Sequence, residues 1–431
     1  MIDYVRYVLP NGLRLIVHED HATLMAAVSV QYDVGSRDES PDRTGFAHLF
    51  EHLMFGGSAH APSYDDPLQL AGGENNAFTN ADITNFYVSV PADNLATALW
   101  LEADRMAHLN VDPDVLDVQR RVVVEEFKET CLNEPYGDAW HHMSALAYRT
   151  HPYRWPTIGL TPEHLAEANL EDVRAFYARH YHAGNAIVAV AGAVRAEAVY
   201  RLVLKFFGAL PAPVDSEAGR VLPAEPAQTE ARELEVRGNA AVDSLYLTYA
   251  MPGRTDADFY VLDLLTDVLA EGPSSRLYRR LLKERELATT IDAYVTGTSD
   301  PGLVVIEAKP REGVSLEALR DAIAEQIAEL QRELVPPLEL EKVKNKLEAS
   351  MAFSELSIVN KAINLCFYEG IDDLPLINRE EEVYAAITAE ELRRAAREYL
   401  VPARSCTVYY RAQTGEGERL PLPRAAEVGV E

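Results

Sequence analysis

The chain contains two histidines four residues apart, with a glutamate directly before the second. In the segment His48-Leu49-Phe50-Glu51-His52, an α-helix would place His48, Glu51 and His52 on one side, because positions i, i+3 and i+4 share a face. Two imidazoles can bind one zinc ion, and a carboxylate beside them can act as a general base toward water. The order His-x-x-Glu-His inverts the commoner zinc-protease motif. The segment therefore predicts a zinc hydrolase with one zinc ion, held by His48 and His52, and with Glu51 as the catalytic residue.

A helix must carry these side chains, and the surrounding sequence predicts one from about Gly45 to Phe55. Apolar residues flank the two histidines, and the glycine pair Gly56-Gly57 would end the helix. The alternative for a histidine on a helix is a structural side chain that binds no metal.

A catalytic zinc site also needs a third protein ligand and an open position. The best source is a second predicted helix, from about Asp114 to Asn133, which contains three glutamates. Glu125, Glu126 and Glu129 are all suitable from their chemistry, and a solvated helix face is the alternative for each. A buried carboxylate on this helix would need a partner, such as a metal ion. The apolar periodicity directs four residues toward a core: Leu116, Val122, Val123 and Phe127.

The composition bounds the class of protein. The chain has 431 residues, 48% hydrophobic and 25% charged, which is enough for two or more cores. It contains no apolar run of about 18 residues, so we expect no membrane span and no membrane partner. The net charge of −28 argues against nucleic acid as a partner. This acidity would either line a cavity that attracts basic peptides or coat a solvated outer face.

The cysteines and the first residues of the chain indicate which cellular compartment to expect. Cys131, Cys366 and Cys406 are not spaced as pairs, so we expect buried thiols in a reducing cytoplasm rather than a disulfide framework. The first residues show neither a basic head nor a long apolar stretch, and no signal or transit peptide is visible.

Strand and helix patterns occur in both halves of the chain. Pro10-Asn11-Gly12 would turn a hairpin between residues 4–9 and 13–17. The alternation in residues 27–34 predicts a half-buried strand. Further elements are expected at these residues: a strand at 86–90, a helix at 94–107, a helix then a strand at 170–177 and 186–191, and the same order at 388–393 and 406–410.

The repeated helix–strand ending indicates an internal duplication. Prolines are concentrated between residues 211 and 230, which is typical of a semi-rigid linker. The predicted fold is α+β, with two homologous domains that each pack a mostly antiparallel sheet with helices. The expected boundaries are 1–212 for a zinc-binding peptidase domain, 213–230 for the linker, and 231–431 for an inactive-type peptidase-like domain.

Several motifs together resemble the inverzincin peptidases of the insulinase, pitrilysin and mitochondrial processing peptidase family. They cover essentially the whole chain, at the length of the short two-domain bacterial members. The matching segments are 48–52, 72–79 (Gly-Gly-Glu-Asn-Asn-Ala-Phe-Thr), 82–87, 120–126 and 272–278.

The resemblance implies roles for further residues. The third zinc ligand would be Glu126, with Glu125 as the runner-up. Gln119 stands where the family has a glutamate outside the metal ligands, so charge near the site would be reduced. Asn76, Ala77 and Phe78 would bind the substrate backbone by strand addition. The implied activity is metal-assisted peptide hydrolysis of unfolded segments inside an enclosed chamber, with Glu51 as the general base.

One part of the family's site is missing from this chain. Active members place an Arg and a Tyr seven residues apart to bind substrate and stabilise the oxyanion, and here Leu282 and Thr289 occupy those positions. An oxyanion donor is worth about 3 kcal/mol or more. We therefore expect a heterodimer with a related subunit that carries the Arg/Tyr pair, with a homodimer as the alternative. A non-catalytic structural or peptide-binding subunit is the competing function.

Overall fold

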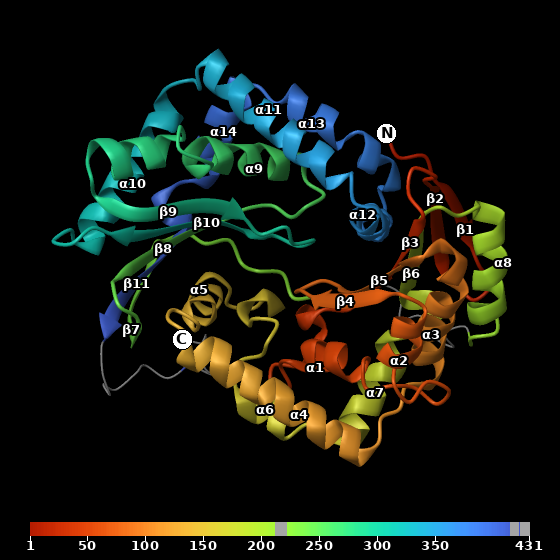
Figure 1. Cartoon of the computed structure of the whole chain (residues 1–431). Helices are drawn as coiled ribbons and strands as arrows, with labels where there is room; N and C mark the ends of the chain where they lie inside the picture. The colour runs from red at the N-terminus through yellow and green to blue at the C-terminus, as the bar shows by residue number, and fades with distance from the viewer. Residues whose placement is uncertain (212–221, 414–421, 423–431) are drawn as a thin grey trace. The chain divides into compact units, whose positions relative to one another are not determined.

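The first half of the chain builds a six-stranded sheet in the computed structural model of the protein, which describes residues 1–211, 222–413 and 422 (Figure 1). Its order is β1-β2-β6-β3-β5-β4. The bounds are β1 (Val5–Val8), β2 (Arg14–Glu19), β3 (Met25–Tyr32), β4 (Glu74–Thr79), β5 (Thr84–Pro91) and β6 (Ala186–Gly192). β2 and β6 run parallel, and every other neighbouring pair is antiparallel.

The second half builds a five-stranded sheet with the matching topology. Its order is β7-β11-β8-β10-β9. The bounds are β7 (Arg232–Asn239), β8 (Ser244–Ala250), β9 (Ala288–Val295), β10 (Leu303–Pro310) and β11 (Ser405–Gln413). Among its described strands, β7 and β11 form the one parallel pair, and the other neighbouring pairs are antiparallel. The pair β2 and β6 has the same place in the first sheet. The equivalent arrangement supports the predicted duplication, and the predicted α+β class with two mostly antiparallel sheets is confirmed.

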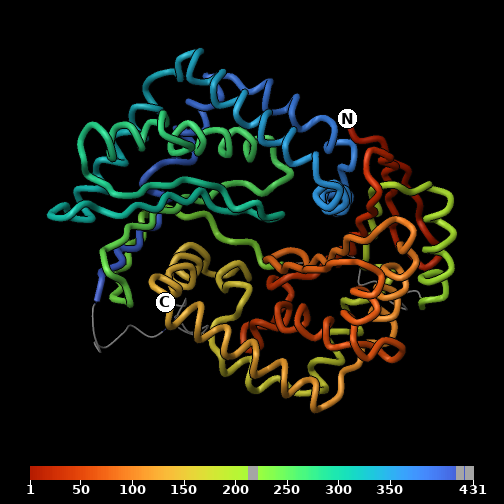
Figure 2. Tube along the Cα trace, in the orientation of Figure 1, coloured from red at the N-terminus to blue at the C-terminus, as the bar shows by residue number. Residues whose placement is uncertain are grey.

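Helices are distributed over two compact units, and the described residues can be followed along the trace in Figure 2. The first unit comprises 1–126, 157–222 and 351–379, and the second 127–156, 223–350 and 380–431. The helices of the first half are α1 (Phe46–Leu53), α2 (Asp65–Leu70), α3 (Leu95–His108), α4 (Pro113–Phe127), α5 (Ala139–Ala147), α6 (Pro162–Ala166), α7 (Leu170–His180) and α8 (Ala196–Phe207). Those of the second half are α9 (Ala257–Ala270), α10 (Leu316–Arg332), α11 (Pro337–Ser354), α12 (Ile358–Gly370), α13 (Glu380–Ala386) and α14 (Ala389–Tyr399).

Each half of the sequence contributes one segment to the other unit. α5 packs on β8 and β11 of the second sheet, whereas α12 packs on β3 and β6 of the first. Arg6 on β1 pairs with Glu369 of α12 at 2.7 Å, and Lys361 of α12 pairs with Asp20 at 2.7 Å. The contacts therefore divide the chain differently from the predicted boundaries 1–212 and 231–431. Residues 213–221 of the predicted linker lie outside the described residues.

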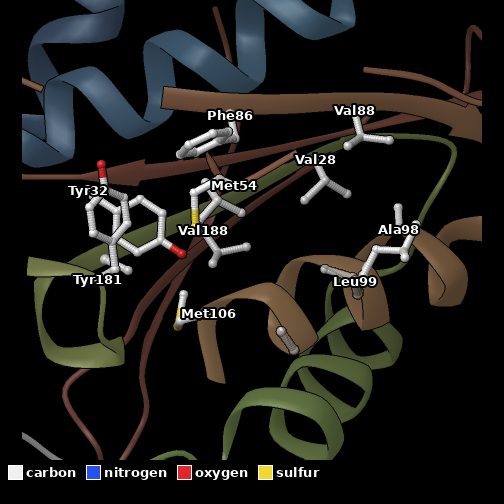
Figure 3. Close-up of a cluster of buried hydrophobic side chains, with 14 of the residues drawn as sticks. Val28, Tyr32, Met54, Phe86, Val88, Ala98, Leu99, Met106, Tyr181 and Val188 are labelled. Carbon is white, nitrogen blue, oxygen red and sulfur yellow. The ribbon is translucent and has the colours of Figure 1, made fainter. Parts of the chain in front are cut away.

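β3 is buried on both faces, whereas its alternating pattern predicted burial on one. Its apolar side chains enter a core with β5, β6, α3 and α7, where Val28, Tyr32, Phe86, Leu99 and Tyr181 are buried (Figure 3). Its polar side chains, Ser29 and Gln31, lie on the opposite face, which α12 covers. Ser29 exchanges hydrogen bonds with Asn85, at 2.9 and 3.2 Å, so burial leaves its hydroxyl satisfied. The prediction of a half-buried strand was wrong, because the helix that covers the polar face lies more than 300 residues later in the sequence and leaves no sign in the local pattern.

The remaining predicted elements are present, and most of their bounds lie within three residues of those expected. α14 ends six residues later than expected, and α4 ends at Phe127, after which residues 128–133 form a π-helical segment. All three cysteine side chains are buried, and burial raises the pKa of the Cys366 thiol to about 12. Among the helices in the described part of the chain, none has the length and apolar character needed to cross a membrane.

Candidate metal centre

α1 holds the two histidines on a helix that is fixed by burial of its other face. Phe46, Leu49, Phe50 and Leu53 are at most 3% exposed, and the Phe50 ring stacks on Tyr181 with 5.2 Å between centroids. His48, Glu51 and His52 lie on the side that remains partly exposed. The helix therefore presents its ligands from a rigid surface.

The N-terminus of α1 is capped by a buried carboxylate. Gly45, the residue before the helix, has a φ of +88° and no capping side chain, so the first N–H groups need a partner elsewhere. Glu39 supplies it, because its carboxylate accepts hydrogen bonds from the N–H of Gly45 (2.9 Å) and the N–H of Ala47 (2.8 Å). Burial raises the pKa of Glu39 well above its ordinary value, and the two N–H donors act against that rise.

α4 brings one glutamate to the histidines. Leu116, Val123 and Phe127 are buried as predicted, but Val122 is 45% exposed, so that part of the prediction was wrong. With 3.6 residues per turn, Val122 lies about a third of a turn from the buried line. Glu126 lies at the edge of the buried face, whereas Glu125 and Glu129 are exposed.

The imidazoles of His48 and His52 converge with Glu126. Glu126 Oε2 lies 3.4 Å from His48 Nε2 and 3.3 Å from His52 Nε2, and the three donor atoms are all within 4.8 Å of one another. The two rings stand edge to face at 79°, with centroids 4.8 Å apart. Glu51 Oε2 lies 3.7 Å from His48 Nδ1 and accepts a 2.5 Å hydrogen bond from Thr79 Oγ1 on β4.

The donor set fits a zinc ion. The Nε2 atom of His48 is buried and has no hydrogen-bond partner among the described residues, which is costly unless a cation binds there. Two imidazole nitrogens and a carboxylate oxygen are a common ligand set of catalytic zinc. Ligand atoms about 3.3 Å apart match a tetrahedral site with bonds of about 2.0–2.1 Å, and both carboxylate–imidazole distances are near that value.

Charge interactions couple the same side chains. Burial lowers the pKa of His48, but the carboxylates of Glu126 and Glu51 outweigh it and raise the pKa to about 9. The two imidazoles hold the pKa of Glu126 far below its ordinary value. Burial raises the pKa of Glu51, but His48 and Thr79 together leave it below the ordinary value. The site therefore keeps both carboxylates ionised, as a cation requires.

The predicted substrate-binding residues lie on an edge strand. β4 is the last strand of its sheet and pairs only with β5, with Asn76 opposite Tyr87, Ala77 opposite Phe86 and Phe78 opposite Asn85. Its other edge is unpaired by any described strand. Thr79 at the end of β4 joins this strand to Glu51. Substrate binding by Asn76, Ala77 and Phe78 stays a prediction that this position permits.

Three further positions were singled out by the sequence. Gln119 is half-buried on α4. Leu282 is half-buried in the π-helical turn 278–284, and Thr289 is exposed on β9 and bonds the Lys309 carbonyl at 3.2 Å. Their side chains carry neither the guanidinium nor the phenol expected at those positions.

Sequence reasoning assigned no role to Glu39 or Thr79. A signal for Glu39 exists, because a helix that starts at glycine lacks a side-chain cap and needs an acceptor from outside. Thr79 ends the segment 72–79, and only the fold brings its hydroxyl to Glu51.

Both halves of the chain match models of known protein families. The family model described as Insulinase (Peptidase family M16) matches residues 14–159, and the model described as Peptidase M16 inactive domain matches residues 167–347. The residues that converge in the metal centre all lie within the first match.

Individual relatives cover most of the chain. The zinc protease PqqE of Helicobacter pylori is 29% identical over 405 residues, which are 93% of this chain and 91% of that protein. A probable mitochondrial-processing peptidase subunit beta of Arabidopsis thaliana is 26% identical over 80% of this chain and 66% of that protein. The crystal structure of a protease from Helicobacter pylori superimposes with a TM-score of 0.89 at 29% identity, covering 95% of this chain and 100% of that one.

Proposed function

Because the chain belongs to the insulinase family, peptidase family M16, we propose that it is the zinc-bearing subunit of an endopeptidase. The family predicted from the sequence is confirmed, and relatives in it are named zinc proteases. The convergence of His48, His52 and Glu126, with Glu51 beside them, is the observation that carries the proposal. The substrates would be peptides or unfolded segments, cleaved in an enclosed chamber.

In the proposed mechanism, His48, His52 and Glu126 would hold one zinc ion, which would supply Lewis-acid activation of water and of the scissile carbonyl. Glu51 accepts the proton that the attacking water loses and returns it to the leaving amine. Thr79 fixes the Glu51 carboxylate by its hydrogen bond. Asn76, Ala77 and Phe78 on the free edge of β4 align the peptide backbone by strand addition.

A partner chain would complete this site. Leu282 and Thr289 offer no cationic or phenolic donor for the oxyanion, and the relative from Arabidopsis is named as one subunit of a processing peptidase. We expect a related subunit with an Arg/Tyr pair seven residues apart, or else a second copy of this chain. Without such a donor, the reaction would lose about 3 kcal/mol of stabilisation or more.

The test compares four proteins: the parent chain, E51Q, E126Q and E125Q. Each is assayed for zinc content and for cleavage of an unfolded peptide, alone and with a related chain that carries the Arg/Tyr pair. We expect E51Q to keep zinc but lose activity by about 10²–10⁴-fold, and E126Q to lose zinc. E125Q is the matched control, because Glu125 is exposed on the same helix, and it should behave as the parent.

The competing function is a non-catalytic subunit, and the specific observation for it is that Leu282 and Thr289 occupy the positions of the Arg/Tyr pair. It predicts bound zinc but no cleavage in either pairing, and no difference between the parent and E51Q. Full activity of the lone chain that persists on dilution would contradict the need for a partner.

A further inference from the structure

A second set of metal-binding side chains lies in the first unit and shares no residue with the α1–α4 site. It consists of His60, Asp104 and His108, whose donor atoms are all within 4.8 Å of one another. Asp104 and His108 are four residues apart at the end of α3, so they share a helix face. His60 comes from the loop that follows α1.

Backbone contacts fix this loop against the end of α3. The N–H of Ala59 donates to the His108 carbonyl at 2.9 Å, and the N–H of Asn110 donates to the Gly57 carbonyl at 3.1 Å. Ser58 and Leu109 form an antiparallel bridge between the same two segments. The relative position of His60 and His108 therefore depends on main-chain hydrogen bonds as well as on side chains.

Asp104 brings a buried carboxylate to this position. Its side chain is 5% exposed, and it accepts hydrogen bonds from the His60 N–H (3.1 Å), from His60 Nδ1 (2.6 Å) and from the Ser58 hydroxyl. A cation bound between His60 and Asp104 would take the place of the proton that Nδ1 donates to the carboxylate.

The two imidazoles are arranged like those of the α1–α4 site. The rings of His60 and His108 stand edge to face at 72° with centroids 5.3 Å apart, compared with 79° and 4.8 Å for His48 and His52. His108 is also the last residue of α3, where the helix dipole favours a positive charge. The arrangement of the two rings and the dipole of α3 thus both favour a cation between His60 and His108.

We propose that His60, Asp104 and His108 form a second site for a divalent transition metal, with zinc as the first choice. Two imidazoles and one carboxylate suit zinc and its neighbours, whereas calcium and magnesium prefer an all-oxygen set. The ion would fasten the loop after α1 to the end of α3 and leave remaining positions to solvent. The role would be structural, because the ion would join two segments that the backbone already holds together.

Equilibrium dialysis of the full metal-free chain against zinc, followed by metal analysis, tests the proposal. We expect the parent to bind two ions per chain. H60A and H108A should each bind one ion at the same zinc concentration, because each variant lowers the affinity of the second site at least tenfold relative to the parent. Both histidines are exposed, so these variants should keep the parent's fold, and circular dichroism without metal checks this. H21A is the matched control, because His21 is similarly exposed at 57%, and it should bind two ions.

The H52A background separates this proposal from the proposed function. There, one ion should remain bound, and adding H108A should remove it, whatever the activity of the chain. A single ion in the parent, or a second ion that H60A and H108A both retain at unchanged affinity, would overturn the proposal. In that case Asp104 serves only to close the loop through Ser58 and His60.

Discussion

Glu51 shows how much of this site depends on contacts from outside its own helix. Its carboxylate lies 3.7 Å from His48 Nδ1 on α1 and accepts a 2.5 Å hydrogen bond from Thr79 on β4. The sequence motif predicts the first neighbour from helical spacing, but it contains no information about the second. A general base is effective only when its position is fixed, so Thr79 belongs with Glu51 in the proposed chemistry.

Replacing Thr79 by valine tests this dependence. T79V keeps the branched shape suited to a strand but removes the hydroxyl donor, so Glu51 gains freedom to turn away from the reacting water. We expect kcat to fall about tenfold or more with zinc content unchanged, since an oriented hydrogen bond of this kind is worth about 1.5–3 kcal/mol. T79S restores the donor and should recover most of the activity. Equal losses in T79V and T79S would contradict a positioning role.

Asp267 on α9 provides a stability effect that depends on pH. Burial and the carboxylates of Asp263 and Glu271 raise its pKa to about 7, while Lys346 acts in the opposite direction. The folded state therefore prefers the protonated form. Stability from this group is full below the ordinary pKa of 3.8, decreases as the pH rises, and is lost above about 7.

The D267N variant should remove that pH dependence, because an amide stays neutral throughout. One pKa unit corresponds to about 1.4 kcal/mol, and solvent screening reduces the effect at a partly exposed group. We expect D267N to be about 1–2 kcal/mol more stable than the parent at pH 8 and equal to it near pH 4, measured by urea unfolding. D93N, at an exposed position, removes the same charge and should leave the difference between the two pH values unchanged.

At the scale of elements, the sequence predicted the helices and strands well and their environments less well. α1 and α4 occur where periodicity placed them, and Glu126 converges with the histidines. Val122 is exposed because two adjacent residues cannot both follow one line of a helix. β3 is covered on its polar face by α12, and no local pattern in residues 25–32 announces a helix from residues 358–370.

The start of α1 gives a prediction at this scale. E39A removes the acceptor of two buried N–H groups and leaves a cavity, and an unsatisfied buried group costs about 1–3 kcal/mol. We expect E39A to lower the free energy of unfolding by about 2–4 kcal/mol and to weaken zinc binding, because both histidines are on that helix. E39Q keeps one acceptor oxygen and should lie between E39A and the parent. Unfolding in urea and zinc titration measure the two effects separately.

For the whole molecule, the two sheets share one topology, and each half of the sequence contributes a segment to the other unit. The strand orders match when β2, β6, β3, β5 and β4 are set against β7, β11, β8, β10 and β9. α9 follows β8 as α1 follows β3, but it contains no histidine. The candidate metal centre therefore lies in one of the two duplicated units. The repeated helix–strand endings predicted the duplication, but they did not predict the strand order.

The exchange of segments predicts how the chain behaves after one cut. Residues 127–156 belong by contacts to the second unit and 351–379 to the first, so each fragment of a chain cut between 212 and 222 holds part of both units. The ion pairs of α12 with Arg6 and Asp20 and the packing of α5 on β8 and β11 are kept after cleavage. With a specific protease site inserted there, we expect the cut protein to elute from gel filtration as one species with its zinc bound. The fragments should separate only in denaturant, whereas two folded units without exchanged segments would separate in native buffer.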